Sequence, residues 1–97
     1  MIRSFRDQGA EDVFNGLDTK RARSVCPSEL WVRAQRRLSQ LDYASSLLDL
    51  RLPRSNRLHQ LVGDRNGQHS ISINMEYRMC FVWSPDGPRD VEITDYH

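Results

Sequence analysis

The strongest candidates for catalytic residues lie in two places. One is an arginine inside an otherwise apolar segment, and the others are the last residues of the sequence. Arg78 lies within "MEYRMCF", and Tyr96 and His97 follow the alternating run "VEITD". A buried arginine needs a partner for its charge. That partner is either an acidic residue of a neighbouring strand, such as Glu92 or Asp95, or a bound anion. The sequence leaves both interpretations open.

Together, the arginine, tyrosine and histidine supply the chemistry of a ribonuclease that needs no metal ion. Histidine gives or takes a proton near neutral pH. Tyrosine hydrogen-bonds a phosphate or stacks on a base, and arginine stabilises charge on a phosphate in the transition state. The RNA 2′-hydroxyl would be the nucleophile. Many domains contain these three residue types, so the pattern alone is a weak signal.

Other candidate motifs are weaker evidence for a functional site. His59 and His69 do not form a zinc-ligand spacing with Cys26 or Cys80, and we expect no metal site and no cofactor. The segment "GDRNG" lacks the phosphate-loop pattern. It is either a simple turn or a turn that carries Arg65 to a nucleic-acid backbone. No order of serine, histidine and aspartate indicates a hydrolase triad.

Length and composition predict one domain that spans residues 1–97. No apolar run approaches the roughly 20 residues of a membrane helix, and the charged N-terminus does not resemble a signal peptide. We therefore expect a cytoplasmic protein with no membrane partner. Two cysteines in such a chain are expected to be reduced, buried thiols.

The basic residues are almost all arginine and are unevenly placed. Of 14 basic residues 13 are arginine, and the formal charge is +4 over residues 1–59 and −3 over residues 60–97. The guanidinium fork matches pairs of phosphate or carboxylate oxygens. A solvated helical face and a surface for nucleic acid or an acidic partner explain this pattern equally well.

Hydrophobic spacing predicts helices in the first half of the chain. A brief helix is expected in "GAEDVFNG", and "DTKRARSV" is either loop or another helical turn. The clearest helix lies in "CPSELWVRAQRRLSQLDYA", where a stripe recurs at helical spacing. Its members are Leu30, Ala34, Leu38 and Leu41. Three arginines at positions 33, 36 and 37 are expected on the other side of that helix.

Alternating patterns predict strands in the second half. They occur in "QHSISINMEY", "YRMCFVW" and "RDVEITDYH", and "SPDGP" is a turn between the last two. "MIRSF" could add a short strand. Consecutive strands with short connections form an antiparallel meander. Helices followed by strands predict an α+β fold, with the N-terminal helices packed on one face of a small antiparallel sheet.

Four segments together resemble one known family. "MIRSFRDQGAEDVFNG", "NRLHQLVGDRNGQHSISIN", "YRMCFVW" and "DVEITDYH" are similar to the HigB-type toxins of bacterial toxin–antitoxin modules, within the RelE/ParE superfamily. The resemblance implies a RelE-like fold and cleavage of messenger RNA at the ribosomal A site. It also implies a HigA-type helix-turn-helix antitoxin, through which the complex would bind its operator DNA.

The resemblance also assigns roles to residues. Arg78 matches the arginine at the scissile phosphate, and His97 matches a C-terminal histidine implicated in catalysis, with Asp95 and Tyr96 as its supporting neighbours. Arg65 matches the basic residue of the GDR turn. Many relatives have the sequence S-I-R-I-N where this chain has residues 70–74. In this segment Ser72 and Asn74 match the positions expected to contact RNA.

Two positions depart from the family pattern. Val62 and Ser72 stand where many relatives carry a basic residue. Charge-assisted contacts to phosphate are roughly twice as strong as neutral ones. The sequence therefore predicts a weakened toxin, or one that depends more on the ribosome to position the messenger RNA.

Two alternatives follow from the same resemblance. The fold also serves ParE-type gyrase inhibitors, so the protein could bind gyrase without cleaving RNA. It could also be a degenerate toxin that acts only in its complex with antitoxin and operator. The basic surface over residues 20–37 would suit either ribosomal RNA or an acidic antitoxin segment.

Overall fold

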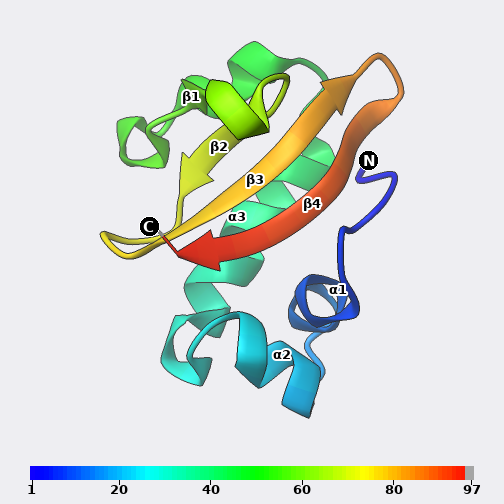
Figure 1. Ribbon diagram of the computed structural model, residues 1–97, viewed down its shortest axis with the longest axis vertical. Helices are drawn as coiled ribbons and strands as arrows, with labels where there is room; N and C mark the ends of the chain where they lie inside the picture. The colour runs from blue at the N-terminus through cyan, green and yellow to red at the C-terminus, as the bar shows by residue number, and fades with distance from the viewer. Residues whose placement is uncertain (96–97) are drawn as a thin grey trace.

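A computed structural model describes residues 1–95, so Tyr96 and His97 lie outside the described residues. The chain forms helices first and an antiparallel sheet second, which confirms the α+β prediction (Figure 1). The α-helices are α1 (Gln8–Phe14), α2 (Lys20–Val25) and α3 (Trp31–Tyr43). Four short 3₁₀ helices are η1 (Ser28–Leu30), η2 (Leu47–Arg51), η3 (Arg54–Asn56) and η4 (Gly63–Arg65).

The sheet has four strands in the order β1-β2-β3-β4. The strands are β1 (His59–Gln60), β2 (His69–Ser72), β3 (Tyr77–Ser84) and β4 (Gly87–Asp95). The last three form the expected meander. The first segment is not a strand of its own, because only Phe5 bridges to Val91, in parallel, at the outer edge of β4.

The N-terminal helices begin at side-chain caps. Asp7 accepts a hydrogen bond from the Ala10 N–H at 2.8 Å, and Thr19 accepts one from the Ala22 N–H at 3.0 Å. Such bonds satisfy amides that have no partner within the helix. The segment "DTKRARSV", for which the sequence predicts either loop or a helical turn, therefore contains α2.

The core lies between α3 and one face of the sheet. Ala34, Leu38 and Leu41 of the predicted helical stripe are fully buried, whereas Leu30 is only partly buried. On the sheet, the core-facing side chains come from alternate positions of three strands, as period-2 patterning predicts. They are Ile71, Met79, Phe81, Val91 and Ile93. In Figure 1, α3 runs behind the sheet.

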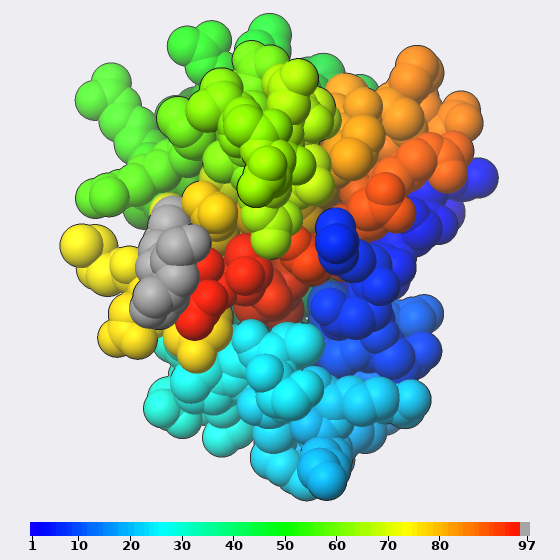
Figure 2. All heavy atoms as spheres, in the orientation of Figure 1, coloured from blue at the N-terminus to red at the C-terminus, as the bar shows by residue number. Residues whose placement is uncertain are grey.

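The opposite face of the sheet is polar. Register pairs Ser72 with Arg78 and Arg78 with Thr94, and directly opposed residues share a face. A second row of the same kind contains Ser70, Cys80 and Glu92. In the space-filling view, the yellow-green segment 61–68 overlies part of this face (Figure 2). Within residues 1–95, no helix has the length and apolar character to span a membrane.

Candidate active site

Arg78 lies on the polar face of a central strand, away from the core. It is half-buried, and its neighbours in the cross-strand row are Ser72 and Thr94. The prediction that it points opposite to Met79 is confirmed, because Met79 is fully buried in the core. The sheet therefore presents the guanidinium where a ligand can reach it.

A cavity of about 770 Å³ opens beside Arg78, along the edge of β2. We call it the basic cavity. Its polar lining includes Arg33, Arg37, Arg57, His59, Asn74 and Arg78, together with serines 55, 70 and 72. Leu58, Ile73 and Met75 form its apolar wall. Three of the residues predicted for the site, Ser72, Asn74 and Arg78, are thus brought together.

Two arginines of α3 reach the edge of the sheet. Arg37 donates from Nε to the Ser72 carbonyl oxygen at 3.0 Å, and Arg33 donates from Nη1 to the Ile73 carbonyl oxygen at 3.4 Å. Strand β1 pairs only with His69 and Ser70, so it does not extend along this part of β2. The prediction that these arginines lie on the far side of the helix is wrong, because both turn toward the sheet.

The basic cavity concentrates positive charge. Among its lining residues within positions 1–95 there is no aspartate or glutamate. Burial lowers the pKa of the Arg37 guanidinium, and the nearby charge of Arg33 lowers that pKa further. A guanidinium stays protonated at neutral pH even so. The cavity is therefore suited to an anionic ligand.

Asn74 closes the turn between β2 and β3. Its side-chain oxygen accepts hydrogen bonds from the N–H groups of Glu76 at 2.8 Å and Tyr77 at 2.7 Å. An asparagine that bonds the backbone two or three residues ahead fixes a turn. The part of Asn74 that can serve a ligand is therefore its amide nitrogen, which is a donor.

His59 is a site residue that sequence analysis missed. It belongs to β1, pairs in register with Ser70, is exposed, and lines the basic cavity. The quoted segment "NRLHQLVGDRNG" contains it, but no spacing relates it to Arg78 in the sequence. Only the pairing of β1 with β2 brings this imidazole near the arginine.

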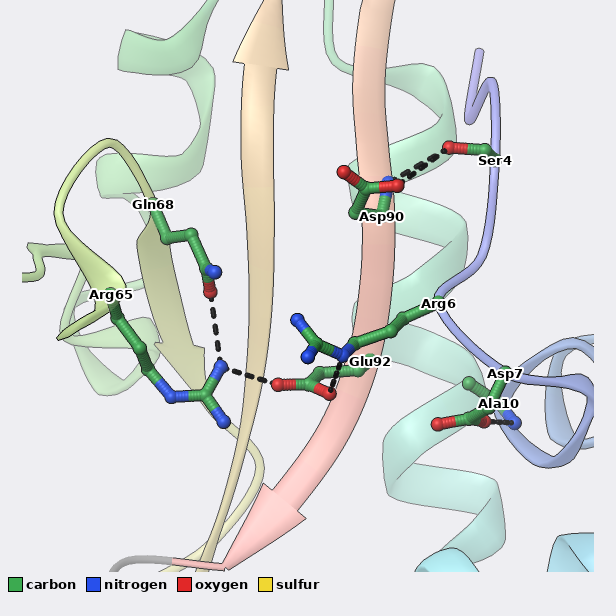
Figure 3. A network of polar contacts seen from close by, with 8 residues as sticks. All are labelled: Ser4, Arg6, Asp7, Ala10, Arg65, Gln68, Asp90 and Glu92. Carbon is green, nitrogen blue, oxygen red and sulfur yellow. Dashed lines mark hydrogen bonds and ion pairs between the residues drawn. The ribbon is translucent and has the colours of Figure 1, made fainter.

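Arg65 lies in η4 and pairs with a carboxylate of β4. Its Nη1 donates to Glu92 and, at 3.1 Å, to Gln68, while Arg6 forms an ion pair with the same glutamate at 3.2 Å (Figure 3). The hydrogen bond that Arg65 donates to the Glu92 carboxylate raises the pKa of Arg65. Arg65 does not line the basic cavity. Its predicted contact with RNA stays a prediction.

The remaining predicted site residues lie at the end of β4. Asp95 is exposed and pairs in register with Tyr77. The expected roles of Tyr96 and His97 fall outside the described residues. Val62, the first departure from the family pattern, is 81% exposed, while Ser72, the second, is buried at the wall of the basic cavity.

Neither cysteine is placed for catalysis. Both Cys26 and Cys80 are free thiols and buried, as expected. Burial raises the pKa of Cys26 to about 11 and also raises the pKa of Cys80. Both are therefore poor nucleophiles at neutral pH. Over residues 1–95, no group of three or more potential ligands could hold a metal ion.

The sequence is similar to known proteins of one family. A family model described as "RelE-like toxin of type II toxin-antitoxin system HigB" matches residues 3–97. The chain is 37% identical over 83 residues to Toxin HigB-1 of Vibrio cholerae serotype O1, which covers 86% of this chain and 84% of that protein. It is 30% identical over 97 residues to Endoribonuclease HigB of Proteus vulgaris, with complete coverage of both.

Proposed function

Because the chain belongs to the HigB family of RelE-like toxins of type II toxin–antitoxin systems, we propose that it is an endoribonuclease that cleaves messenger RNA in the ribosomal A site and so inhibits translation. The observation that carries this proposal is the presence of Arg78 and His59 in one cavity rich in arginine. The relative from Proteus vulgaris is named an endoribonuclease, which supports the same activity here.

The reaction requires only groups of the RNA and of the protein. A base removes the proton of the 2′-hydroxyl, whose oxygen then attacks the adjacent phosphorus. The bond from phosphorus to the 5′-oxygen breaks, and an acid protonates that oxygen as it leaves. Arg78 stabilises the additional negative charge on the phosphate. The products are a 2′,3′-cyclic phosphate and a 5′-hydroxyl.

Two histidines are candidates for the proton transfers. His59 lines the basic cavity with Arg78, and the family resemblance assigns a role to His97. An imidazole serves as either acid or base at neutral pH. Tyr96 and Asp95 would support His97, and Ser72 and Asn74 would hydrogen-bond the RNA near the scissile phosphate.

The same proposal includes the cellular compartment and the partners of the protein. We propose that the protein acts in the cytoplasm and is inhibited by a HigA-type helix-turn-helix antitoxin, through which alone the complex binds operator DNA. Val62 and Ser72 provide no charge to the RNA, so the ribosome would supply part of the positioning.

Mapping the ends of a messenger RNA on programmed ribosomes tests the nuclease. The wild-type protein would be compared with Arg78→Ala, His59→Ala and His97→Ala, and with Arg89→Ala as a control at an exposed position of β4 outside the basic cavity. We expect discrete A-site cuts from the wild type and the control. Arg78→Ala should reduce cutting by about 10²–10³-fold. Intact RNA from every protein would refute the proposal, and inhibition of gyrase supercoiling would then support the ParE-like alternative.

A further inference from the structure

Three arginines of the basic cavity come from outside the sheet. Arg33 and Arg37 belong to α3, and Arg57 follows η3. Within residues 1–95, none of the three forms an ion pair with a carboxylate. Other arginines of the chain do form such pairs, namely those at positions 6, 21, 23, 65 and 89. The positive charge of these three arginines is therefore not neutralised by the described protein.

The contacts of the α3 arginines hold them in place but do not compensate their charge. Arg37 donates to the Ser72 carbonyl and, from Nη2, to the Ser55 hydroxyl at 3.3 Å. Arg33 donates to the Ile73 carbonyl. All three acceptors are neutral. Arg37 is half-buried and Arg33 is exposed. Like charges held close together are unfavourable unless an anion lies between them.

Arg57 adopts a backbone conformation that arginine rarely adopts. Its φ is 48° and its ψ is 51°, in the left-handed region at the end of η3. This region costs an ordinary residue about 1–2 kcal/mol, whereas glycine and asparagine adopt it readily. Residues in such conformations are enriched at active sites and at sites that hold ligands.

The volume of the cavity allows more than one phosphate. At about 770 Å³ it falls within the range of roughly 300–1,000 Å³ that holds whole organic ligands. Arg78 approaches from β3, and the other arginines approach from α3 and from the segment after η3. The cavity therefore has room for a second phosphate beside the one at Arg78.

We propose that Arg33, Arg37 and Arg57 form a second phosphate site, which binds the messenger RNA backbone phosphate next to the one held by Arg78. This inference rests on the proposed function. Contacts to phosphate position a nucleic acid without reading its sequence. The second site would therefore fix which phosphate lies at Arg78, and it would supply from α3 the charge that Ser72 lacks.

Binding of a non-cleavable RNA tests the site apart from the reaction. The probe is a short single-stranded RNA with a 2′-deoxy nucleotide at the cut position, titrated at several salt concentrations. Each phosphate contact contributes about 0.7 to the slope of log affinity against log salt. The variant Arg33→Gln/Arg37→Gln should lose about 0.7–1.4 of that slope and bind about tenfold more weakly or worse. Arg36→Gln is the matched control, because Arg36 is exposed on the same helix and does not line the cavity.

Two further variants distinguish binding of phosphate by positive charge from a purely structural role of the arginines. Arg33→Lys/Arg37→Lys should restore most of the salt slope, whereas a purely structural role would not be rescued by charge alone. Arg57→Asn suits the left-handed backbone, so it should fold and still lose about 0.7 of slope. Thermal melting would verify that each variant is folded. If the glutamine pair does not fold, the lysine pair and Arg57→Asn decide the question.

Cleavage kinetics then distinguish positioning from chemistry. With ribosomes in single-turnover reactions, the glutamine pair should require about tenfold more protein for half-maximal rate and reach a similar maximal rate. The second site is refuted if folded variants keep the wild-type affinity and salt slope, or if the wild type does not bind the probe. Failure of the proposed nuclease function would give a different result. Neither the wild type nor any variant would then cut RNA, yet the variants would still lose salt-dependent binding of the probe.

Discussion

At the scale of single residues, His69 makes stability depend on pH. Its ring stacks on Phe81 with centroids 6.2 Å apart, and its buried Nδ1 has no hydrogen-bond partner in residues 1–95. Burial lowers the pKa of His69 below 6.5. The folded state thus disfavours the proton, so this contribution to stability is present above pH 6.5 and is lost as the pH falls through the lower folded pKa.

The variant His69→Phe isolates this effect, because phenylalanine keeps an aromatic ring and cannot be protonated. We expect the free energy of unfolding to fall less steeply in the variant than in the wild type as the pH decreases below 6.5. Urea titrations on both sides of that value measure the difference. Parallel pH profiles for the two proteins would show that His69 does not titrate differently on unfolding.

Individual site residues were predictable only where the signal was local. Arg78 was identified because a charged residue interrupts an apolar strand, and alternation alone placed it opposite Met79. His59 gave no local signal, since its position depends on how two residues of β1 pair with β2. The partner of Glu92 was also not predictable. The carboxylate pairs with Arg65 and Arg6, and both arginines are distant from Glu92 in the sequence.

At the scale of elements, the α1–α2 connection depends on one hydroxyl. Thr19 accepts a hydrogen bond from the Ala22 N–H at 3.0 Å and donates one to Asp12 at 2.7 Å. We expect Thr19→Ala to reduce the free energy of unfolding by about 1–2 kcal/mol. Thr19→Ser keeps both bonds and should cost less. Denaturant titration measures both, and equal losses for alanine and serine would contradict the role of the hydroxyl.

Helical periodicity predicted α3 but not the direction of its arginines. Apolar residues identified the buried stripe, of which Ala34, Leu38 and Leu41 are fully buried. Arg33 and Arg37 are predicted on the side of the helix opposite that stripe. Their long stems instead follow the helix surface and deliver the guanidinium groups to carbonyls of the sheet edge. Such contacts arise from the distance between two elements, which no local pattern encodes.

At the scale of the whole molecule, Glu92 joins three distant parts of the chain. The carboxylate is buried on β4 and binds Arg6 of the N-terminal segment and Arg65 of η4 (Figure 3). We expect Glu92→Gln to destabilise the protein by about 1–3 kcal/mol, less than a fully buried pair because both arginines are partly exposed. Amide hydrogen exchange should accelerate around residues 63–68. Unchanged exchange there would show that η4 is held by other contacts.

The outer edge of β4 depends on the first residues of the chain. The Arg3 N–H donates to the Pro88 carbonyl at 2.8 Å, the Val91 N–H donates to the Ser4 carbonyl at 3.1 Å, and the Arg6 N–H donates to the Val91 carbonyl at 2.9 Å. An uncovered strand edge can pair with another chain and aggregate. We therefore expect deletion of residues 1–6 to produce oligomers in size-exclusion chromatography and a lower melting temperature.

A side-chain change in the same segment serves as the control for that deletion. Arg3→Ala removes an exposed side chain but keeps the backbone bond to Pro88, so it should elute at the same volume as the wild type. If the deletion variant also elutes at that volume and is as stable as the wild type, the edge of β4 is protected in another way. If it associates, the N-terminal segment closes the sheet, and the strand that leads toward Tyr96 and His97 depends on the beginning of the chain for its integrity.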